Sequence, residues 1–578
     1  MRKLIFTFAS ALLALGSNAQ SLSRVNNAPN LGNKTLKTFY NEEAPGLQRE
    51  NLVPTAFTQA NGTTLRSIKR SSTDGLPFIT EQPEGVLYKN LYRFSHNYYY
   101  YWGFICEAKK DGALSQYVIA DNGDVYIKDV ISSISGNSWI KGTRGEGDTI
   151  NVTLPQTYYS ENELDADGNP TDKIDYYYAW RMKMGEIDNN GSKSQTLLPD
   201  EETQTIKYVL RNDSLILVDN EDKGIYIGLG NADGQWTGYA ELSTMLTKET
   251  AETVTPSANA TVDTYSINYN ANGYDDVKII KVAIDGDNIY LGNIDDSMPD
   301  AWAKGKIEGG KAVFEPSYLG IDTIFGYHTY FFPADYKLQK RTYNSTDSLW
   351  FENTLVFDYD ANAKTLKADR TILVNGGRNI VKAAYNYNKP LVKAWKNEAK
   401  APALPQFISY TDYIDQIGEG SYDIKLPVNA ADGTILDPKK LYYNIYYDDE
   451  LFTYTPDEYV MLTEDMTDVP YNFVDRWDFF KFGDTRTLFF HHTGFDTIGV
   501  DAFYKDGDTE CHSGRVTYNV NTHTTGIDSK LTDAEQKVAA VTFTDLSGRS
   551  VAHPKHGVYL KTIKYADGTI KTKKMICK

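Results

Sequence analysis

The sequence predicts an all-β protein: tandem antiparallel β domains, then an immunoglobulin or fibronectin III-like sandwich and a small C-terminal β sandwich. The 578 residues include 43 Tyr, 24 Phe and 8 Trp, residue types that favour strands. Asn, Asp and Gly turn signals separate short apolar runs, and long helix-forming runs are few. Composition and turn spacing therefore both indicate strands joined by tight turns.

A third observation is an internal repeat. Tyr126 is followed 13 residues later by Trp139, and Tyr290 is followed 12 residues later by Trp302. Each Trp continues as Trp-x-Lys-Gly, and the two copies lie about 164 residues apart. This period is far longer than that of a solenoid or propeller, so the repeat predicts two related domains in tandem.

Residues 1–19 have the features of a secretory signal peptide. A basic start and an apolar stretch precede the small-residue site Ser17-Asn18-Ala19, so we expect cleavage between Ala19 and Gln20. No later run approaches the about 18 apolar residues of a membrane span, so we expect none in the mature chain. Residues 20–75 are polar and lack apolar periodicity, which predicts a disordered leader.

The two related domains are predicted at residues 76–250 and 251–400. In the first, the turn Asp121-Asn122-Gly123-Asp124 separates two apolar runs, which is a strong hairpin signal because both central positions need positive φ. In the second, Asp285-Gly286-Asp287-Asn288 takes the corresponding place. The order of apolar runs around these turns is the same in both domains.

A Pro-rich stretch at residues 401–405 marks a domain boundary, after which residues 403–522 contain short strands spaced by turns. This pattern predicts a two-sheet sandwich. The strand YYNIYYDDE, which begins at Tyr442, and the hairpin that begins at Ile498 and returns through Ser513 resemble the fibronectin type III-like domains of secreted Bacteroidetes proteins.

Residues 525–578 contain the strand VTFTDLSGR, which ends at Arg549, the strand GVYL after His556, and a Lys-rich end. These motifs resemble the C-terminal sorting domains of type IX secretion cargo in Bacteroidetes. The resemblance implies a sorting or anchoring domain, the type IX export machinery as a partner, and a location outside the cell or on its outer surface after export through the periplasm. Charged edges that prevent unwanted strand pairing would equally explain the lysines.

The N-terminal two-thirds carries a weaker resemblance. Residues 81–85 (EQPEG) lead into an aromatic strand, and a Thr/Lys-rich turn follows each Trp-x-Lys-Gly element. These features resemble uncharacterised exported proteins of the same bacterial group, a resemblance that implies export but no particular activity.

Charge and cysteine content exclude several classes of function. The formal net charge is −18, and losing Arg2 and Lys3 with the signal peptide makes the mature chain more acidic. This charge argues against nucleic acid or an anionic membrane as a partner. Three Cys cannot form a disulfide framework, and Cys106 has no nearby basic group to activate it, so we expect a buried thiol.

The sequence contains no catalytic or cofactor-binding motif that we recognise among the standard nucleophile elbows, phosphate loops and zinc patterns. His491 and His492 beside Asp496 could bind a metal, but a polar strand end is the favoured interpretation. Residues 165–169 (DADGN) offer alternating oxygen ligands, yet the Gly is misplaced for a calcium loop, which favours a turn. We therefore expect no enzyme, no cofactor and no metal.

Aromatic residues provide the one functional suggestion. Strand alternation places Tyr98, Tyr100 and Trp102 on one face, where their rings could stack on a sugar. The repeated Tyr and Trp residues could form similar platforms. Their preserved spacing instead favours positions in the domain cores.

The domain order and the lack of catalytic motifs favour an exported, non-catalytic surface or secreted protein that binds a glycan, a host protein or an envelope component. One alternative is a secreted peptidase or glycoside hydrolase whose residues lie on loops without a local motif. Another is a structural component of a surface layer.

Overall fold

The computed structural model describes residues 76–577 apart from 102–103, 165–169, 190–191, 219–223, 272, 341–344, 529–537, 546–548, 552–556 and 566–569. The all-β prediction is confirmed, since the regular structure of these residues consists of strands and the short 3₁₀ helix η4 (Pro438–Lys440). In the same residues no helix is long and apolar enough to cross a membrane. The predicted cleavage site and leader lie outside the described residues.

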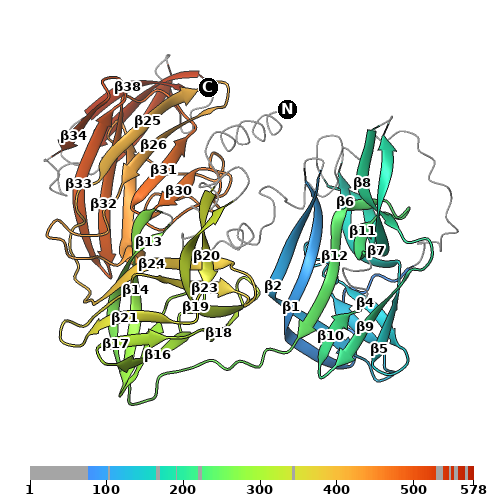
Figure 1. Cartoon of the computed structure of the whole chain (residues 1–578). Helices are drawn as coiled ribbons and strands as arrows, with labels where there is room; N and C mark the ends of the chain where they lie inside the picture. The colour runs from blue at the N-terminus through green and yellow to red at the C-terminus, as the bar shows by residue number, and fades with distance from the viewer. Residues whose placement is uncertain are drawn as a thin grey trace.

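Residues 76–250 form the first unit, unit 1 (Figure 1). Eight of its strands close a ring in the antiparallel order β1-β2-β3-β4-β5-β9-β10-β12, and β12 pairs back to β1. The other four form a flanking sheet that joins the ring where β11 pairs with β12. The strands are β1 (Val86–Tyr101), β2 (Phe104–Ile119), β3 (Val125–Lys128), β4 (Trp139–Arg144), β5 (Thr149–Thr153), β6 (Gln156–Leu164), β7 (Pro170–Asn189), β8 (Ser192–Pro199), β9 (Thr205–Arg211), β10 (Ser214–Leu217), β11 (Ile225–Gly230) and β12 (Trp236–Thr247).

Residues 251–400 form unit 2, whose strands pair in the same pattern. The ring runs β13-β14-β15-β16-β17-β21-β22-β24 and closes on β13, and β23 joins the flanking strands β18, β19 and β20 to β24. The strands are β13 (Thr261–Ala271), β14 (Tyr274–Asp285), β15 (Asn288–Gly292), β16 (Trp302–Glu308), β17 (Lys311–Phe314), β18 (Ser317–Asp322), β19 (Tyr327–Lys340), β20 (Ser345–Phe351), β21 (Leu355–Asp360), β22 (Thr365–Lys367), β23 (Thr371–Gly376) and β24 (Ala383–Ala394).

Two unusual backbone positions recur in both units. Asp129 (φ 49°) and Asn293 (φ 58°) each stand three residues after the repeated Tyr. Ser243 (φ 55°) and Lys389 (φ 48°) each lie where the last ring strand shifts register. Positive φ is uncommon outside glycine, so its recurrence at matching positions shows that the two units share one backbone plan.

Each ring encloses its own apolar core. Alternate side chains point inward, as on β3, where Val125 and Ile127 are buried, and on β21, where Leu355 and Phe357 are buried. Burial of one face per strand follows from the two-residue period of a strand. Each unit therefore has a hydrophobic core of its own within the same pattern of strand pairing.

The third part is a sandwich of two sheets, β25-β26-β31-β30 and β28-β27-β32-β33-β34, with β29 paired to β27. One aromatic core joins the sheets, with Tyr422 and Phe490 from the first and Tyr443 and Val500 from the second. The strands are β25 (Gln406–Ile414), β26 (Glu419–Lys425), β27 (Leu441–Tyr447), β28 (Glu450–Leu451), β29 (Val469–Pro470), β30 (Phe479–Phe482), β31 (Thr485–Phe490), β32 (Thr497–Asp506), β33 (Thr509–Asn519) and β34 (Thr524–Asp528).

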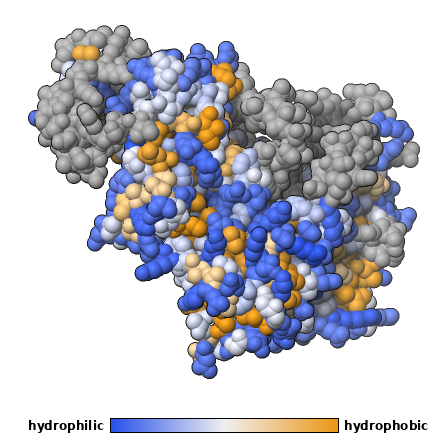
Figure 2. Space-filling view, turned by 60° about the vertical axis from the view of Figure 1, so that its left-hand side comes forward, coloured by the Kyte–Doolittle hydropathy of each residue, from blue (hydrophilic) through white to orange (hydrophobic). Residues whose placement is uncertain are grey.

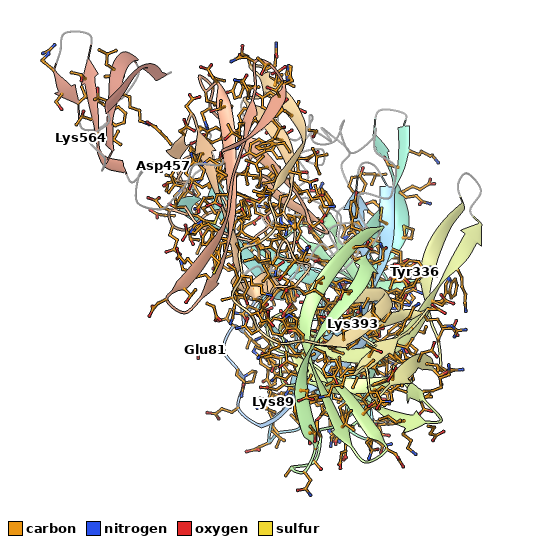
Figure 3. The ribbon with its side chains drawn as sticks, turned by 90° about the vertical axis from the view of Figure 1, so that its left-hand side faces the viewer. Glu81, Lys89, Tyr336, Lys393, Asp457 and Lys564 are labelled. Atoms are coloured by element: carbon orange, nitrogen blue, oxygen red, sulfur yellow. The ribbon has the colours of Figure 1, made fainter. Side chains whose placement is uncertain are left out.

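The last part is a four-stranded antiparallel sheet in the order β36-β35-β37-β38. Its strands are β35 (Val538–Asp545), β36 (Ser550–Val551), β37 (Gly557–Tyr565) and β38 (Ile570–Cys577). Figure 3 shows this sheet, which carries Lys564, beside the sandwich that carries Asp457, and Lys561 of β37 forms an ion pair with Glu450 of β28. Residues 524–528, where the sorting-domain resemblance begins, pair with β33 and so belong to the sandwich sheet.

The parts contact one another in series. Unit 1 meets unit 2 where Ala113 of β2 pairs with Tyr327 of β19, and Gly112 lies so close to Gly377 that a Cβ would come within 2.5 Å of its Cα. Unit 2 meets the sandwich through the buried ion pair between Asp276 and Lys481. In both junctions the second strand of a unit contacts the next part of the chain.

Candidate functional site

The repeated Tyr and Lys occupy matching positions in the two rings. Tyr126 pairs across the sheet with Lys141, and Tyr290 pairs with Lys304. Each Lys Nζ lies over the Tyr ring, 6.0 Å from the centroid in unit 1 and 5.8 Å in unit 2. The Tyr and the Lys of the motif are therefore cross-strand partners that form a cation–π contact.

The repeated Trp holds the segment that leads into each ring. The Trp139 backbone N–H donates to the Ile79 carbonyl at 2.8 Å. In unit 2, Trp302 forms an isolated β-bridge with Val254, which takes the place of Ile79. Trp139 is 2% exposed and Tyr290 is buried, whereas Tyr126 and Trp302 are half-buried. Tyr126 and Trp302 therefore do not lie in the domain cores that the preserved spacing favours, and the backbone contact by itself does not require an indole.

The Gly of the motif is required by packing. A Cβ on Gly142 would lie 2.9 Å from a Val152 methyl, and one on Gly305 would lie 2.9 Å from the Phe314 ring. Val152 and Phe314 take the same place in the two rings. Every position of the Trp-x-Lys-Gly element thus has a packing or pairing role.

Tyr98 and Tyr100 lie on one face of β1, as alternation predicts, and both are half-buried. Tyr98 meets Tyr226 edge-on with ring centroids 5.0 Å apart, and Tyr100 meets Trp236 at 6.5 Å. These rings belong to an aromatic cluster between β1 and the flanking sheet. Trp102, the third predicted member, lies outside the described residues.

Unit 1 contains a buried ion pair that its repeat lacks. Arg93 Nη2 lies 3.3 Å from Glu241 Oε1, and both side chains are almost inaccessible to solvent. Glu241 also accepts hydrogen bonds from the Ser132 backbone N–H at 2.6 Å and the Thr244 hydroxyl at 2.8 Å. Because the pair is enclosed and its carboxylate is fully engaged, it suits a structural role better than a catalytic one.

The matching residues of unit 2 are apolar or neutral. By strand register, Ile267 takes the place of Arg93 and Tyr387 takes the place of Glu241. Tyr387 donates its hydroxyl to the Ile294 carbonyl, in the loop that corresponds to the loop holding Ser132. The same ring of strands therefore accommodates a buried ion pair in unit 1 and an isoleucine with a tyrosine in unit 2.

The histidines of the sandwich bind carboxylates inside the fold. His491 Nε2 lies 2.8 Å from Asp478, and His492 Nδ1 lies 3.2 Å from Glu458. Burial lowers the pKa of His491, but the hydrogen bond with Asp478, the charge of that carboxylate and the Gly418 carbonyl together hold this pKa above its ordinary value. Neither contact involves Asp496, and among the described residues no His, Cys, Asp and Glu group has the arrangement of a metal site.

Cys106 is half-buried and unbonded, in a strand position opposite Tyr99, so it is less enclosed than the sequence suggested. Cys511 is also a free, half-buried thiol. The calcium-like residues 165–169 lie outside the described part of the chain. None of these positions forms a site in the part that the structure describes.

The strongest candidate surface lies on unit 2, where Trp350 is 48% exposed. Trp350 sits on β20, whose one partner strand in the described residues is β19, directly opposite Asp335. Arg370 lies 3.7 Å from Asp335 and 3.6 Å from Glu352. Lys337 Nζ lies 2.6 Å from Glu352, and this hydrogen bond lowers the Glu352 pKa.

We call Trp350, Asp335, Lys337, Glu352 and Arg370 the Trp350 surface. Sequence reasoning missed it because Leu349-Trp350-Phe351 has the composition of a buried strand. In unit 1 the matching position is Leu198, which lies opposite Lys183, and Asp200 there binds Lys183 at 3.0 Å. Charged residues held in ion pairs therefore occur at this place in both units, whereas the exposed indole is found in unit 2.

No protein-family model matches the chain, and no curated protein is similar to it in sequence. Function is therefore inferred from the chemistry of these surfaces.

Proposed function

We propose that this is an exported, non-catalytic binding protein and that its ligand is a glycan that binds at the Trp350 surface. The observation that carries this proposal is a half-exposed tryptophan on a strand, framed by carboxylates and cations that are already held in ion pairs. Tyr98 and Tyr100, the aromatic residues favoured from the sequence, pack against other side chains of unit 1. Their rings are therefore less available to a ligand than Trp350.

The chemistry of the Trp350 surface suits a sugar. An indole presents a flat apolar face for the C–H side of a sugar ring, while Asp335 and Glu352 can accept hydrogen bonds from hydroxyls. Lys337 and Arg370 can donate to ring and hydroxyl oxygens. Because the ion pairs already restrict these side chains, less conformational entropy is lost when a ligand binds.

One face of the molecule gives no sign of assembly through a single large apolar surface. On the face seen in Figure 2, hydrophilic residues predominate and apolar residues gather in small patches. Patches of this kind are usual for soluble chains. In Figure 3 the β19–β20 hairpin, near the label of Tyr336, lies at the edge of the molecule in that view.

Replacing Trp350 by Ala should abolish most of the glycan affinity. Aromatic residues at the centre of a binding surface often contribute about 2 kcal/mol or more, which corresponds to a loss of about thirtyfold. A glycan array would identify the ligand, and calorimetry would compare the Kd of the two proteins. Trp477→Ala is the matched control, since Trp477 is 42% exposed but lies in the sandwich. Equal affinity of Trp350→Ala and the unchanged protein would exclude this site.

We propose further that residues 529–578 direct export, on the basis of their resemblance to type IX sorting domains. Truncation after Asp528 keeps β34 in the sandwich sheet, so the rest of the protein should stay folded. We expect the truncated protein to accumulate in the periplasm and to keep the melting temperature of the sandwich. Surface display of the truncated protein at the normal level would contradict the sorting role.

A further inference from the structure

His328 of unit 2 is buried at the junction with unit 1. The residue is 1% exposed and follows Tyr327, which pairs with Ala113 of unit 1. His328 Nε2 lies 3.0 Å from the backbone carbonyl oxygen of Asn90, a residue of β1 in unit 1. A hydrogen bond of this imidazole therefore joins the two units directly.

The two hydrogen bonds of His328 determine which ring nitrogen carries the proton. A carbonyl oxygen can only accept, so Nε2 carries the proton and donates it to the Asn90 carbonyl. His328 Nδ1 lies 2.8 Å from the Tyr318 hydroxyl, which donates to it when the ring is neutral. Both nitrogens are thus satisfied by a neutral imidazole, and a second proton on Nδ1 would take the place of the hydrogen that Tyr318 donates.

The charged groups that face His328 from the unit 2 side are already paired. Glu249, in the segment between the units, lies 2.6 Å from the Arg378 guanidinium and also accepts the Tyr330 hydroxyl. Burial is the largest influence on the pKa of His328, and it lowers this pKa. The Asn90 carbonyl and Glu249 oppose the effect of burial, whereas Arg378 adds to it, and the pKa of the imidazole lies below its ordinary value.

The groups that face His328 from unit 1 are engaged as well. The Tyr92 ring packs against the imidazole with centroids 5.5 Å apart, and the Tyr92 hydroxyl donates to Asp111. Asp111 also accepts backbone N–H groups of residues 379–380, and the Lys382 ammonium of unit 2 donates to a backbone carbonyl of β2. A second proton on His328 would therefore place a positive charge in a buried site whose carboxylates already have partners.

We propose that protonation of His328 weakens the junction between units 1 and 2, so that mild acid makes this junction open more often. The other junction contacts remain in mild acid: Asp111 keeps its backbone partners, and Tyr92 and Phe94 stay packed on an apolar face of unit 2. We therefore expect more frequent opening of the junction with both units still folded. This inference is independent of glycan binding and of export.

The direction of the effect follows from the protons bound in the two states. In the open junction His328 is solvated and has its ordinary pKa of about 6.5, whereas burial in the closed junction lowers this pKa. The stabilisation is therefore fully present above about pH 6.5 and is lost as the pH falls through the lower value, by up to about tenfold in the opening equilibrium per pH unit. Glu249 does not contribute in this range, because its pKa lies below its ordinary value of 4.5.

Hydrogen exchange of the full mature chain between about pH 7.5 and about pH 5 tests the proposal. The Leu114 N–H reports on the junction, because it donates across it to the Gly326 carbonyl at 2.9 Å. Its protection, corrected for the intrinsic exchange rate, should fall by up to about tenfold per pH unit below about pH 6.5. Amides of β3 and β21, inside the two rings, should keep their protection.

His328→Gln retains an N–H donor for the Asn90 carbonyl but cannot titrate, so the Leu114 protection should no longer depend on pH. His512→Gln is the matched control. This histidine lies in the sandwich, where its Nδ1 is 2.6 Å from Asp501, so its replacement should leave the pH dependence of Leu114 unchanged. Equal protection of Leu114 at both pH values, or a folded His328→Gln protein that keeps the dependence, would overturn the proposal.

A measurement on the unchanged protein keeps the test decisive if His328→Gln does not fold. Nitrogen NMR of labelled histidine, with signals assigned by replacing the other histidines one at a time, follows the His328 ring through the titration. We expect a neutral ring protonated at Nε2 at about pH 7.5, and protonation of Nδ1 together with the loss of Leu114 protection. Protonation of His328 without loss of protection, or loss of protection while the ring stays neutral, would contradict the proposal.

Discussion

Replacing Glu241 by Ala should lower the free energy of unfolding of unit 1 by about 3–5 kcal/mol, the cost of breaking a buried ion pair by removing one partner. The substitution leaves the Arg93 guanidinium buried without its carboxylate, although it keeps its hydrogen bond to the Asp129 carbonyl at 2.7 Å. It also leaves the Ser132 N–H and the Thr244 hydroxyl without the carboxylate that accepts their hydrogen bonds. The shift of the calorimetric transition that includes unit 1 would measure the loss.

Unit 2 supplies the control for this prediction. The double variant Arg93→Ile with Glu241→Tyr installs the residues that unit 2 uses at the same positions. Replacing a buried ion pair by well-packed neutral residues is often neutral or stabilising by about 1–4 kcal/mol, so the double variant should regain most of the lost stability. A double variant less stable than Glu241→Ala would show that the two rings pack differently at this position.

Replacing Asp111 by Ala should uncouple the two units. The carboxylate is fully buried at their junction and accepts backbone N–H groups from Asn379 at 2.7 Å and Ile380 at 2.9 Å. It also accepts the Tyr92 hydroxyl, and burial together with this carboxylate raises the pKa of Tyr92. Each buried donor left without an acceptor costs about 1–3 kcal/mol, so the combined effect should be among the largest at any single residue.

Calorimetry would check the uncoupling. We expect a transition shared by units 1 and 2 to separate into two, with a wider range of inter-unit distances in small-angle scattering. Asp358→Ala is the control, because the Asp358–Lys311 pair is largely exposed and should contribute little to stability. An Asp111→Ala protein that melts like the control would show that the apolar contacts of Tyr92 and Phe94 suffice to hold the junction.

The alternation of residues along β1 predicted part of the aromatic cluster that contains Tyr98 and Tyr100. Alternation correctly placed Tyr98 and Tyr100 on the same face of β1, because successive side chains of a strand point to opposite sides. What covers that face depends on the flanking sheet, which joins β12 through β11, while β12 pairs with β1 between distant residues such as Tyr98 and Ala240. No spacing within β1 could reveal that contact. For the same reason, the exposure of Trp350 depends on what packs on its face of β20, and its own sequence does not reveal this.

By itself, the sequence determined the all-β class, the turns and the repeated Tyr and Trp-x-Lys-Gly element, because strand propensity, turn chemistry and preserved spacing are local properties. The tertiary structure alone decided that β12 returns to β1 and β24 to β13 and so closes the two rings, since these pairings join residues about 120 to 155 positions apart. It also decided that His328 of unit 2 lies at the junction beside Asn90 of unit 1. Those outcomes depend on contacts between residues far apart in the sequence, and such contacts produce no periodic pattern of residue types.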